Sequence, residues 1–318
     1  MYYRLKRKFL KIQNRFRPKS FILMYHRITD LDIDPWDLAV SAENFEEQLK
    51  VLKKSYNVLS LEELIEDKKN NKLRDKSIAI TFDDGYKDNY TAAYPILKKY
   101  QLPATFFISS AYIENQEEFW WDKLIRLIFT DMKQPKRLEL KTIDKYWDID
   151  QDNFDTKARF DFFMNVWDSL LKAHPTVRER ALNEIAAWSG YNKEAELNHL
   201  PMNKADLIDM AQYPLISIGA HTNNHAALSY LDRDSQQKEI RDGKLWLEKV
   251  LNKPITGFAY PNGSFNGDTI SLMEEIGFEY ACTTEEFRNS SYLSDYKMPR
   301  FQVYNWNKKD FVNRLEQW

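Results

Sequence analysis

Two adjacent carboxylates follow a short apolar run and give the chain its first candidate chemistry. Residues 77–82 (SIAITF) form an expected buried strand, and Asp83 and Asp84 come directly after it, before the turn-forming Gly85. Neighbouring side chains point in opposite directions on a regular strand, so both carboxylates serve one site only if the chain leaves the sheet there. Asp-Asp-Gly is also ordinary turn sequence, and on this motif alone that structural interpretation stays open.

A pair of histidines occupies the equivalent position after another apolar run. His221 and His225 follow residues 215–220 (LISIGA) and are two of the five histidines in the chain. One helical turn between them would bring both imidazoles to one side, within reach of a single metal ion. The spacing also arises by chance, but with a carboxylate from another strand end it predicts a His2Asp ligand set. Three protein ligands with an open position for water are typical of a catalytic metal site.

The elements that must position these residues alternate between strands and helices. Ser41 and Ser60 are expected helix N-caps, and Glu63 completes a capping box with Ser60. The alternation predicts parallel strands joined by right-handed crossovers, and six such units favour a barrel over an open sheet. Catalytic side chains in such barrels lie at the C-terminal strand ends. The expected strands are apolar runs at residues 21–25, 77–82, 104–108, 215–220, 257–260 and 280–283.

Composition and charge indicate a globular chain in a reducing compartment. The 318 residues are 43% hydrophobic and 30% charged, with a formal net charge of −2. No apolar run approaches the roughly 18 residues that cross a bilayer, and the N-terminus lacks a signal-peptide pattern. The single cysteine, Cys282, excludes an internal disulfide. We therefore expect a cytoplasmic protein.

Residues 113–213 depart from the alternation and are expected to form a helical insertion. The two flanking segments, 21–112 and 214–318, would then form one barrel. Residues 156–172 and 176–188 show helical patterns inside the insertion. Trp120 and Trp121, expected to be exposed, are the tryptophans of this segment best placed to stack on a sugar ring, although tryptophan at helical spacing more often packs in a core.

Residues 1–20 form a separate basic segment, with eight lysines or arginines and no acidic residue. Apolar side chains are interleaved with the basic ones, partly at helical spacing. This pattern predicts an amphipathic helix in peripheral contact with an anionic membrane surface, at the inner face of the cell membrane. A solvated or packed terminal helix is the alternative. A nucleic-acid partner is not expected, because the remaining chain is net acidic.

Three motifs in this order resemble those of the polysaccharide deacetylase family, the NodB-like carbohydrate esterases of family 4. They are TFDDG at residues 81–85, HTNNH at 221–225 and YPNG at 260–263. An early MYHR at 24–27 is similar to the branch that includes the poly-N-acetylglucosamine deacetylases. The resemblance implies an α/β fold, a distorted and incomplete (β/α) barrel of the NodB type. It also implies metal-dependent removal of N- or O-acyl groups from sugars.

The resemblance assigns a role to each residue of the first two motifs. Asp84, His221 and His225 become the ligands of a divalent metal, most often zinc. Asp83 becomes the general base that takes a proton from the attacking water. A divalent ion lowers the pKa of water within its reach, so a carboxylate can complete this step.

The third motif is expected to stabilise the oxyanion of the tetrahedral intermediate. Backbone N–H groups in the turn at residues 261–263 are the candidate donors, and Tyr260, Pro261 and Asn262 are the candidate oxyanion and substrate residues.

Two departures from the usual family pattern change the expected acid and the expected orienting residue. The family usually has an arginine two residues before the proline of the third motif, where this chain has Ala259. The family's usual acid is a late histidine, and no histidine follows His225 in this chain. In the branch that the chain resembles, the early Tyr-His supplies the acid, so His26 is expected to protonate the leaving amine from a pKa near the ordinary value of about 6.5. Arg300 is expected to replace the missing arginine and orient Asp83, with a surface or core-edge salt bridge as the alternative.

These observations predict a metal-dependent N-deacetylase. Its expected substrate is an N-acetylated amino sugar of a cell-envelope polysaccharide or of a lipid-linked saccharide. A deacylase or deformylase of a small lipid- or nucleotide-linked sugar is one alternative. A catalytically silent carbohydrate-binding barrel is another, but a binding protein needs neither a general base nor metal ligands.

Overall fold

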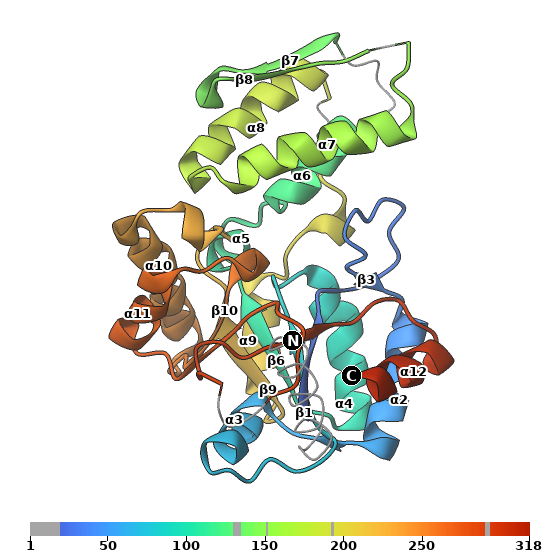
Figure 1. Ribbon diagram of the computed structural model, residues 1–318, viewed down its shortest axis with the longest axis vertical. Helices are drawn as coiled ribbons and strands as arrows, with labels where there is room; N and C mark the ends of the chain where they lie inside the picture. Colours follow the sequence, from blue (N-terminus) through green and yellow to red (C-terminus); the bar gives the residue numbers. More distant parts are fainter. Residues whose placement is uncertain (1–19, 130–134, 151, 192–193, 290–292) are drawn as a thin grey trace, which may run out of the picture.

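A parallel β-sheet forms the frame of the molecule (Figure 1). The computed structural model describes residues 20–129, 135–150, 152–191, 194–289 and 293–318. The sheet has the strand order β11-β10-β9-β6-β5-β1-β12, and β4 pairs with the start of β5. The strands are β1 Ser20–Tyr25, β4 Asn57–Val58, β5 Ser77–Phe82, β6 Ala104–Ile108, β9 Ile216–Ala220, β10 Gly257–Ala259, β11 Tyr280–Cys282 and β12 Phe301–Gln302.

All six expected strands are present, with ends that differ by at most one residue from those predicted. Strands β4 and β12 were not predicted, because two residues each are too short to show a hydrophobic period. The basic segment at residues 1–20 lies, apart from Ser20, outside the described residues, so its amphipathic helix stays a prediction. No helix in the described ranges is long and apolar enough to cross a membrane.

One short segment connects the two edges of the sheet and makes it an incomplete barrel. Met298 bridges Cys282 of the edge strand β11, and three residues later Phe301 pairs with Leu23 of β1. The chain between them crosses the seam of the barrel. This arrangement confirms the expected distorted, incomplete (β/α) barrel, and it places Arg300 at the seam.

Alternation along the strands divides the buried side chains of the sheet between two hydrophobic clusters. Odd residues of β1, such as Phe21 and Leu23, pack in the main cluster under the surrounding helices, whereas Ile22 belongs to a smaller cluster closed by α3 (Leu61–Lys69). Phe107 of β6 lies in the smaller cluster, and Gly219 is required beside it, because a Cβ at that position would lie 2.4 Å from the Phe107 ring. Each fully buried side chain of this size contributes roughly 1.5–3 kcal/mol.

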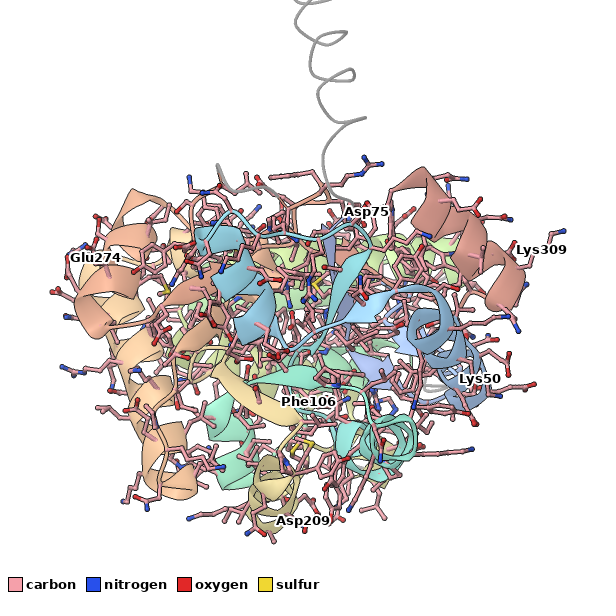
Figure 2. All side chains as sticks on the ribbon, turned by 90° about the horizontal axis from the view of Figure 1, so that it is seen from below. Lys50, Asp75, Phe106, Asp209, Glu274 and Lys309 are labelled. Carbon is pink, nitrogen blue, oxygen red and sulfur yellow. The ribbon has the colours of Figure 1, made fainter. Side chains whose placement is uncertain are left out.

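Helices surround the sheet and present their charged side chains to solvent, as Figure 2 shows for Lys50, Asp209, Glu274 and Lys309 around the central Phe106. Ser41 accepts a hydrogen bond from the Asn44 N–H, and Ser60 forms the expected capping box with Glu63, so both predicted N-caps are confirmed. These helices are α2 Ala42–Ser55, α3 Leu61–Lys69, α4 Tyr94–Tyr100, α5 Ser110–Asn115, α9 Lys204–Gln212, α10 Arg233–Leu251, α11 Gly267–Ile276 and α12 Lys308–Gln317.

A layer of three helices and a hairpin lies apart from these elements, at the top of Figure 1. It consists of α6 Trp120–Ile128, α7 Thr156–Leu171, α8 Pro175–Ser189, and the antiparallel strands β7 Arg137–Leu140 and β8 Lys145–Asp148. We call it the helical layer, and it has a hydrophobic cluster of its own. The two helices expected at 156–172 and 176–188 are present, whereas the hairpin was not expected. Helix α9 also falls within the expected insertion, but it contacts strand β9 of the sheet and is not part of the helical layer. The division of the chain into a barrel and an insertion at 113–213 stays a prediction.

Candidate metal centre and active site

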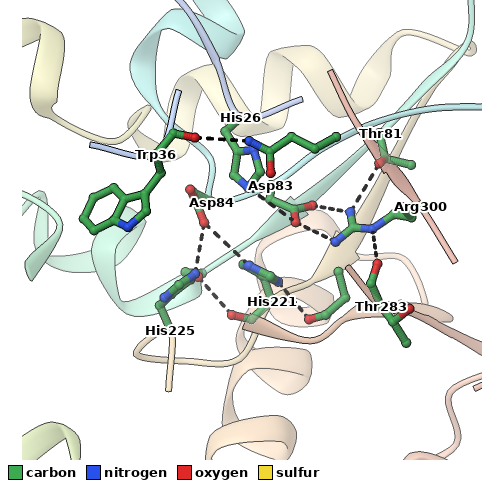
Figure 3. A network of polar contacts seen from close by, with 12 residues as sticks. His26, Trp36, Thr81, Asp83, Asp84, His221, His225, Thr283 and Arg300 are labelled. Atoms are coloured by element: carbon green, nitrogen blue, oxygen red, sulfur yellow. Dashed lines mark hydrogen bonds and ion pairs between the residues drawn. The ribbon is translucent and has the colours of Figure 1, made fainter. Parts of the chain in front are cut away.

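The turn after β5 sends two neighbouring carboxylates to different partners. Asp84 has a φ of +76° and Gly85 a φ of +94°, so the chain leaves the sheet directly after Asp83. A left-handed conformation at a non-glycine residue costs about 1–3 kcal/mol and persists where its surroundings enforce it. Here the Gly85 N–H donates to the Asp83 carbonyl at 3.0 Å, and the Ser109 N–H donates to the Asp84 carbonyl at 3.2 Å. Asp83 consequently contacts Arg300, whereas Asp84 lies against the two histidines (Figure 3).

Asp84, His221 and His225 each bring one candidate ligand atom to a common point. These three atoms lie within 4.8 Å of one another, and all three residues are buried. The Asp84 Oδ1 is 3.5 Å from the His221 Nε2 and 3.2 Å from the His225 Nε2. The structure therefore brings together the three residues that the sequence proposed as a ligand set.

The segment that carries the two histidines is a loop, so the expected helical turn between them is wrong. Thr222 and His225 have φ values of +62° and +50°, and no helix spans residues 221–225. The two imidazole centroids are nevertheless 4.9 Å apart. Left-handed backbone at two positions brings the rings together where a regular helix was expected to do so.

The polar atoms of this cluster fit a divalent cation. The His221 Nδ1 donates to the Ala259 carbonyl at 2.8 Å, so in the neutral ring the Nε2 is an acceptor, and it faces the Asp84 Oδ1. That oxygen is buried without a hydrogen-bond partner in the described part of the chain. Acceptors that face each other without a donor are unfavourable, and a cation between them removes this cost. Imidazole nitrogens and a carboxylate oxygen suit zinc.

The electrostatics of the cluster also favour metal binding. Burial lowers the pKa of His221 to about 4 and that of His225 to about 3, which keeps both imidazoles in the neutral form that metals bind. Burial raises the pKa of Asp84 to about 6, because its charge has no counterion of its own. A bound cation would supply that counterion.

Arg300 holds Asp83 through a buried, bidentate ion pair. Its Nη1 and Nη2 donate to the two carboxylate oxygens at 2.6 and 2.7 Å, and its Nε donates to the Thr283 carbonyl at 3.0 Å (Figure 3). Burial alone would raise the pKa of Asp83, but the guanidinium charge and its hydrogen bonds hold that pKa well below the usual range. Arg300 is fully buried, which excludes the alternative of a surface salt bridge. Its role in orienting a catalytic base stays a prediction.

His26 lies beside Asp83 at the end of β1. Its Nε2 is 4.0 Å from the Asp83 Oδ2, and its side chain is 14% exposed. Burial lowers the pKa of His26, and the nearby Asp84 and Asp83 oppose this shift only in part. This direction runs against the expected pKa near the ordinary value, because sequence position does not reveal how far the ring is buried.

The turn at Pro261–Gly263 leaves one backbone donor for an oxyanion. Pro261 has no N–H, the Tyr260 N–H donates to the Cys282 carbonyl at 3.0 Å, and the Gly263 N–H donates to the Tyr260 carbonyl at 2.9 Å. The Tyr260 hydroxyl donates to the Tyr296 carbonyl, so this side chain is also engaged away from the cavity. Neither Tyr260 nor Pro261 therefore has a free backbone N–H for an oxyanion, and a contact of these residues with substrate stays a prediction. Asn262 lines the cavity and stays the candidate.

A cavity of about 290 Å³ opens onto these residues. Trp120 and Trp121, expected to be exposed, are only 4% and 5% exposed, yet both contribute to its wall. Trp36 and Trp167 also line it, with ring centroids 5.4 Å apart, and sequence reasoning did not single them out for this site. The full lining is Met24, His26, Trp36, Leu38, Asp83, Asp84, Trp120, Trp121, Trp167, His221, His225, Asn262, Thr284 and Gln302.

Comparisons with known proteins identify related sequences and a related fold. The sequence matches the polysaccharide deacetylase family over residues 70–138 and 173–281, which is more than half of the chain. The YxkH protein of Bacillus subtilis is 26% identical over 287 residues, which cover 89% of this chain and 70% of that protein. A poly-beta-1,6-N-acetyl-D-glucosamine N-deacetylase of Staphylococcus aureus is 23% identical over 282 residues, which cover 88% and 72%.

A solved structure has the same fold. The deacetylase PplD of Streptococcus pyogenes, solved in complex with acetate, superposes with a TM-score of 0.63 at 22% identity, covering 94% of this chain and 99% of that one. The family match, the shared fold and the clustered DDG and HTNNH motifs lead to one conclusion. This chain belongs to the polysaccharide deacetylase family.

Proposed function

We propose that this protein is a divalent-metal-dependent hydrolase that removes the N-acetyl group from an amino sugar of a cell-envelope polysaccharide or lipid-linked saccharide. The observation that carries the proposal is the buried cluster of Asp84, His221 and His225, which shares one cavity with Asp83. The name of the S. aureus relative, an N-deacetylase of a poly-N-acetylglucosamine, supports the choice of substrate. Zinc is the proposed metal.

The proposed reaction uses the chain's own residues around the scissile amide. A divalent ion held by the three ligands supplies Lewis-acid activation of the water and of the amide carbonyl. Asp83, kept ionised by Arg300, accepts a proton as the water oxygen attacks the carbonyl carbon. The Asn262 N–H donates to the developing oxyanion. His26, in its protonated form, donates its proton to the nitrogen as the carbon–nitrogen bond breaks. The proton that Asp83 took from water replaces the one that His26 gave, and the products are acetate and the free amine.

The cavity favours a neutral sugar over a phosphorylated one. Among its described lining residues there is no lysine or arginine to pair with a diphosphate. Asn262, Thr284 and Gln302 offer polar groups for hydroxyls, and the tryptophans offer flat apolar faces that suit a sugar ring. This argues against a nucleotide-linked sugar as the substrate.

Acetate release tests the proposal. The zinc-loaded protein is expected to release acetate from oligomers of β-1,6-linked N-acetylglucosamine, and to lose this activity with a chelator and regain it with added zinc. UDP-N-acetylglucosamine serves as the charged comparison and is expected to react poorly. A protein that binds the oligomers but releases no acetate from any N-acetylated saccharide would instead be a silent binding barrel.

Replacement of His26 separates acid catalysis from the other steps. His26→Ala is expected to lower amide turnover by roughly 10²–10⁴-fold, because the amine leaves poorly without a proton. An aryl acetate has a better leaving group, so its hydrolysis should fall much less. His174→Ala, at the start of α8 in the helical layer, is the matched control and should change neither rate. Equal losses on ester and amide in His26→Ala would contradict the acid role.

The N-terminal segment is proposed to contact an anionic membrane surface from the cytoplasmic side. Deletion of residues 1–19 is expected to abolish binding to vesicles that contain phosphatidylglycerol, and salt should weaken the binding of the intact protein. Sedimentation with vesicles measures both effects. An intact protein that does not sediment with these vesicles at low salt would exclude this contact.

A further inference from the structure

The loop that carries both candidate histidine ligands adopts an unfavourable backbone conformation. Thr222 and His225 both have positive φ, which is uncommon outside glycine and a genuine outlier for a β-branched residue such as Thr222. Such a conformation is unfavourable and persists only where the surrounding structure enforces it. The contacts that hold this loop therefore bear on where the His225 imidazole lies.

The barrel side holds the first part of the loop. The Asn223 N–H donates to the Glu239 carbonyl of α10 at 2.9 Å. The N–H and the side-chain amide of Asn224 donate to the Glu239 carboxylate at 2.8 and 2.7 Å. Helix α10 approaches closely at Gly243, where a Cβ would lie 2.8 Å from the Thr222 carbonyl carbon. None of these contacts involves the Asn224 carbonyl or the His225 ring.

The helical layer holds that carbonyl. Arg178 of α8 is 3% exposed, and its Nη2 donates to the Asn224 carbonyl at 2.7 Å. This carbonyl belongs to the peptide group that joins Asn224 to His225, so the bond fixes the plane from which the His225 side chain departs. The guanidinium is itself held 4.7 Å over the Trp120 ring.

The same layer also contacts the His225 ring. The Trp121 ring of α6 lies 4.4 Å from the imidazole, centroid to centroid. The Trp121 Nε1 donates to the Tyr86 hydroxyl at 2.7 Å, and that hydroxyl donates to Asp122 at 2.7 Å. The ring of His225 is thus packed by α6, and its backbone is tethered by α8.

We propose that Arg178 is a positioning residue for His225, in a role that rests on the metal site proposed above. Its hydrogen bond to Asn224 holds the peptide that aims the His225 Nε2 at Asp84, and so couples the helical layer to metal affinity. If Arg178 merely joined α8 to the barrel, its loss would lower stability without changing the metal environment. The two roles are therefore separable by measurement.

Cobalt binding to the full chain tests this role. Co²⁺ is titrated into metal-stripped Arg178→Met protein, with affinity read by chelator competition and ligand geometry by the visible absorption spectrum. Replacement of a group that orients a ligand typically costs 10–100-fold in metal affinity, so we expect a loss of about this size and an altered spectrum. Arg126→Met is the matched control, since Arg126 is in α6 of the same layer and pairs with Glu118. It is expected to leave affinity and spectrum unchanged.

Arg178→Lys provides a second test in case Arg178→Met does not fold. It keeps one positive donor without the fork of a guanidinium, so it should recover part of the affinity lost in Arg178→Met. A folded Arg178→Met, or Arg178→Lys if only that variant folds, with the affinity and spectrum of the unaltered protein would overturn the positioning role. An unaltered protein that binds no Co²⁺ would overturn the proposed metal site, and the positioning role with it. The unaltered protein and the variants therefore report separately on the two proposals.

Discussion

Alanine in place of His221 or His225 is expected to remove the metal and the activity together. Each change deletes one of three buried ligands, and the remaining Asp84 carboxylate and single imidazole hold a divalent ion poorly. The loss of affinity should exceed the roughly 10–100-fold typical of groups that only orient a ligand. Metal content by mass spectrometry and acetate release are measured on the same preparations. His174→Ala again serves as the histidine control.

Stability gives a second measurement of the same site that does not depend on turnover. Zinc at about 100 times its dissociation constant stabilises a protein by about 2.7 kcal/mol, so it should raise the melting temperature of the unaltered protein and not that of the histidine variants. Full metal occupancy in both His221→Ala and His225→Ala would show that the metal lies elsewhere.

Asp84→Asn is expected to raise, or at least keep, the stability of the metal-free protein while it removes the response to zinc. The metal-free protein buries the Asp84 carboxylate without a counterion, and an amide of similar shape removes that charge. This variant should therefore melt at or above the temperature of the unaltered metal-free protein while it no longer responds to zinc. Stability gained in exchange for metal binding is the behaviour expected of a site kept for function.

The barrel was predictable because its signals are local. Strands such as β5 and β6 are short apolar runs with turn residues after them, and Ser41 and Ser60 mark helix starts by side-chain chemistry that acts over three residues. The C-terminal ends of parallel strands share one edge, so Asp84 and His221 could be placed together from their order alone.

The loop at 221–225 was not predictable in the same way. A spacing of four residues indicates a helical turn, but the loop has positive φ at two positions. It is held by contacts from Arg178, Glu239 and Gly243, which are distant from it in sequence. The burial of Trp120 and Trp121 has the same origin. Their exposure depends on how α6 packs against α7 and α8, which hydrophobic period alone does not specify.

The pairing of Asp83 with Arg300 was predictable from the sequence only in part. The two residues are 217 positions apart, and only the absence of the usual arginine at Ala259 suggested a substitute. The seam of the barrel supplies the physical reason for the contact. The segment from Met298 to Phe301 crosses from β11 to β1, which brings Arg300 beside the end of β5.

Asp83→Asn is expected to keep the metal and lose turnover. The amide cannot accept the proton that the proposed base takes from water, and a lost general base typically costs 10²–10⁴-fold. Asp84, His221 and His225 are unchanged, so zinc should remain at full occupancy. Acetate release and metal content, measured on the same sample, separate the two effects.

Asp83→Asn also leaves the buried guanidinium of Arg300 without its partner charge, so the stability of this variant must be controlled. Removal of one partner of a buried ion pair costs about 3–5 kcal/mol when the other charge is left unpaired, although the Asn oxygen can still accept one of the two hydrogen bonds. The assay must therefore run well below the melting temperature of Asp83→Asn. Arg300→Met breaks the same pair but leaves the carboxylate, so it should retain more activity than Asp83→Asn at matched stability. If Asp83→Asn instead loses zinc in proportion to turnover, Asp83 is a metal ligand and the roles of the two aspartates are exchanged.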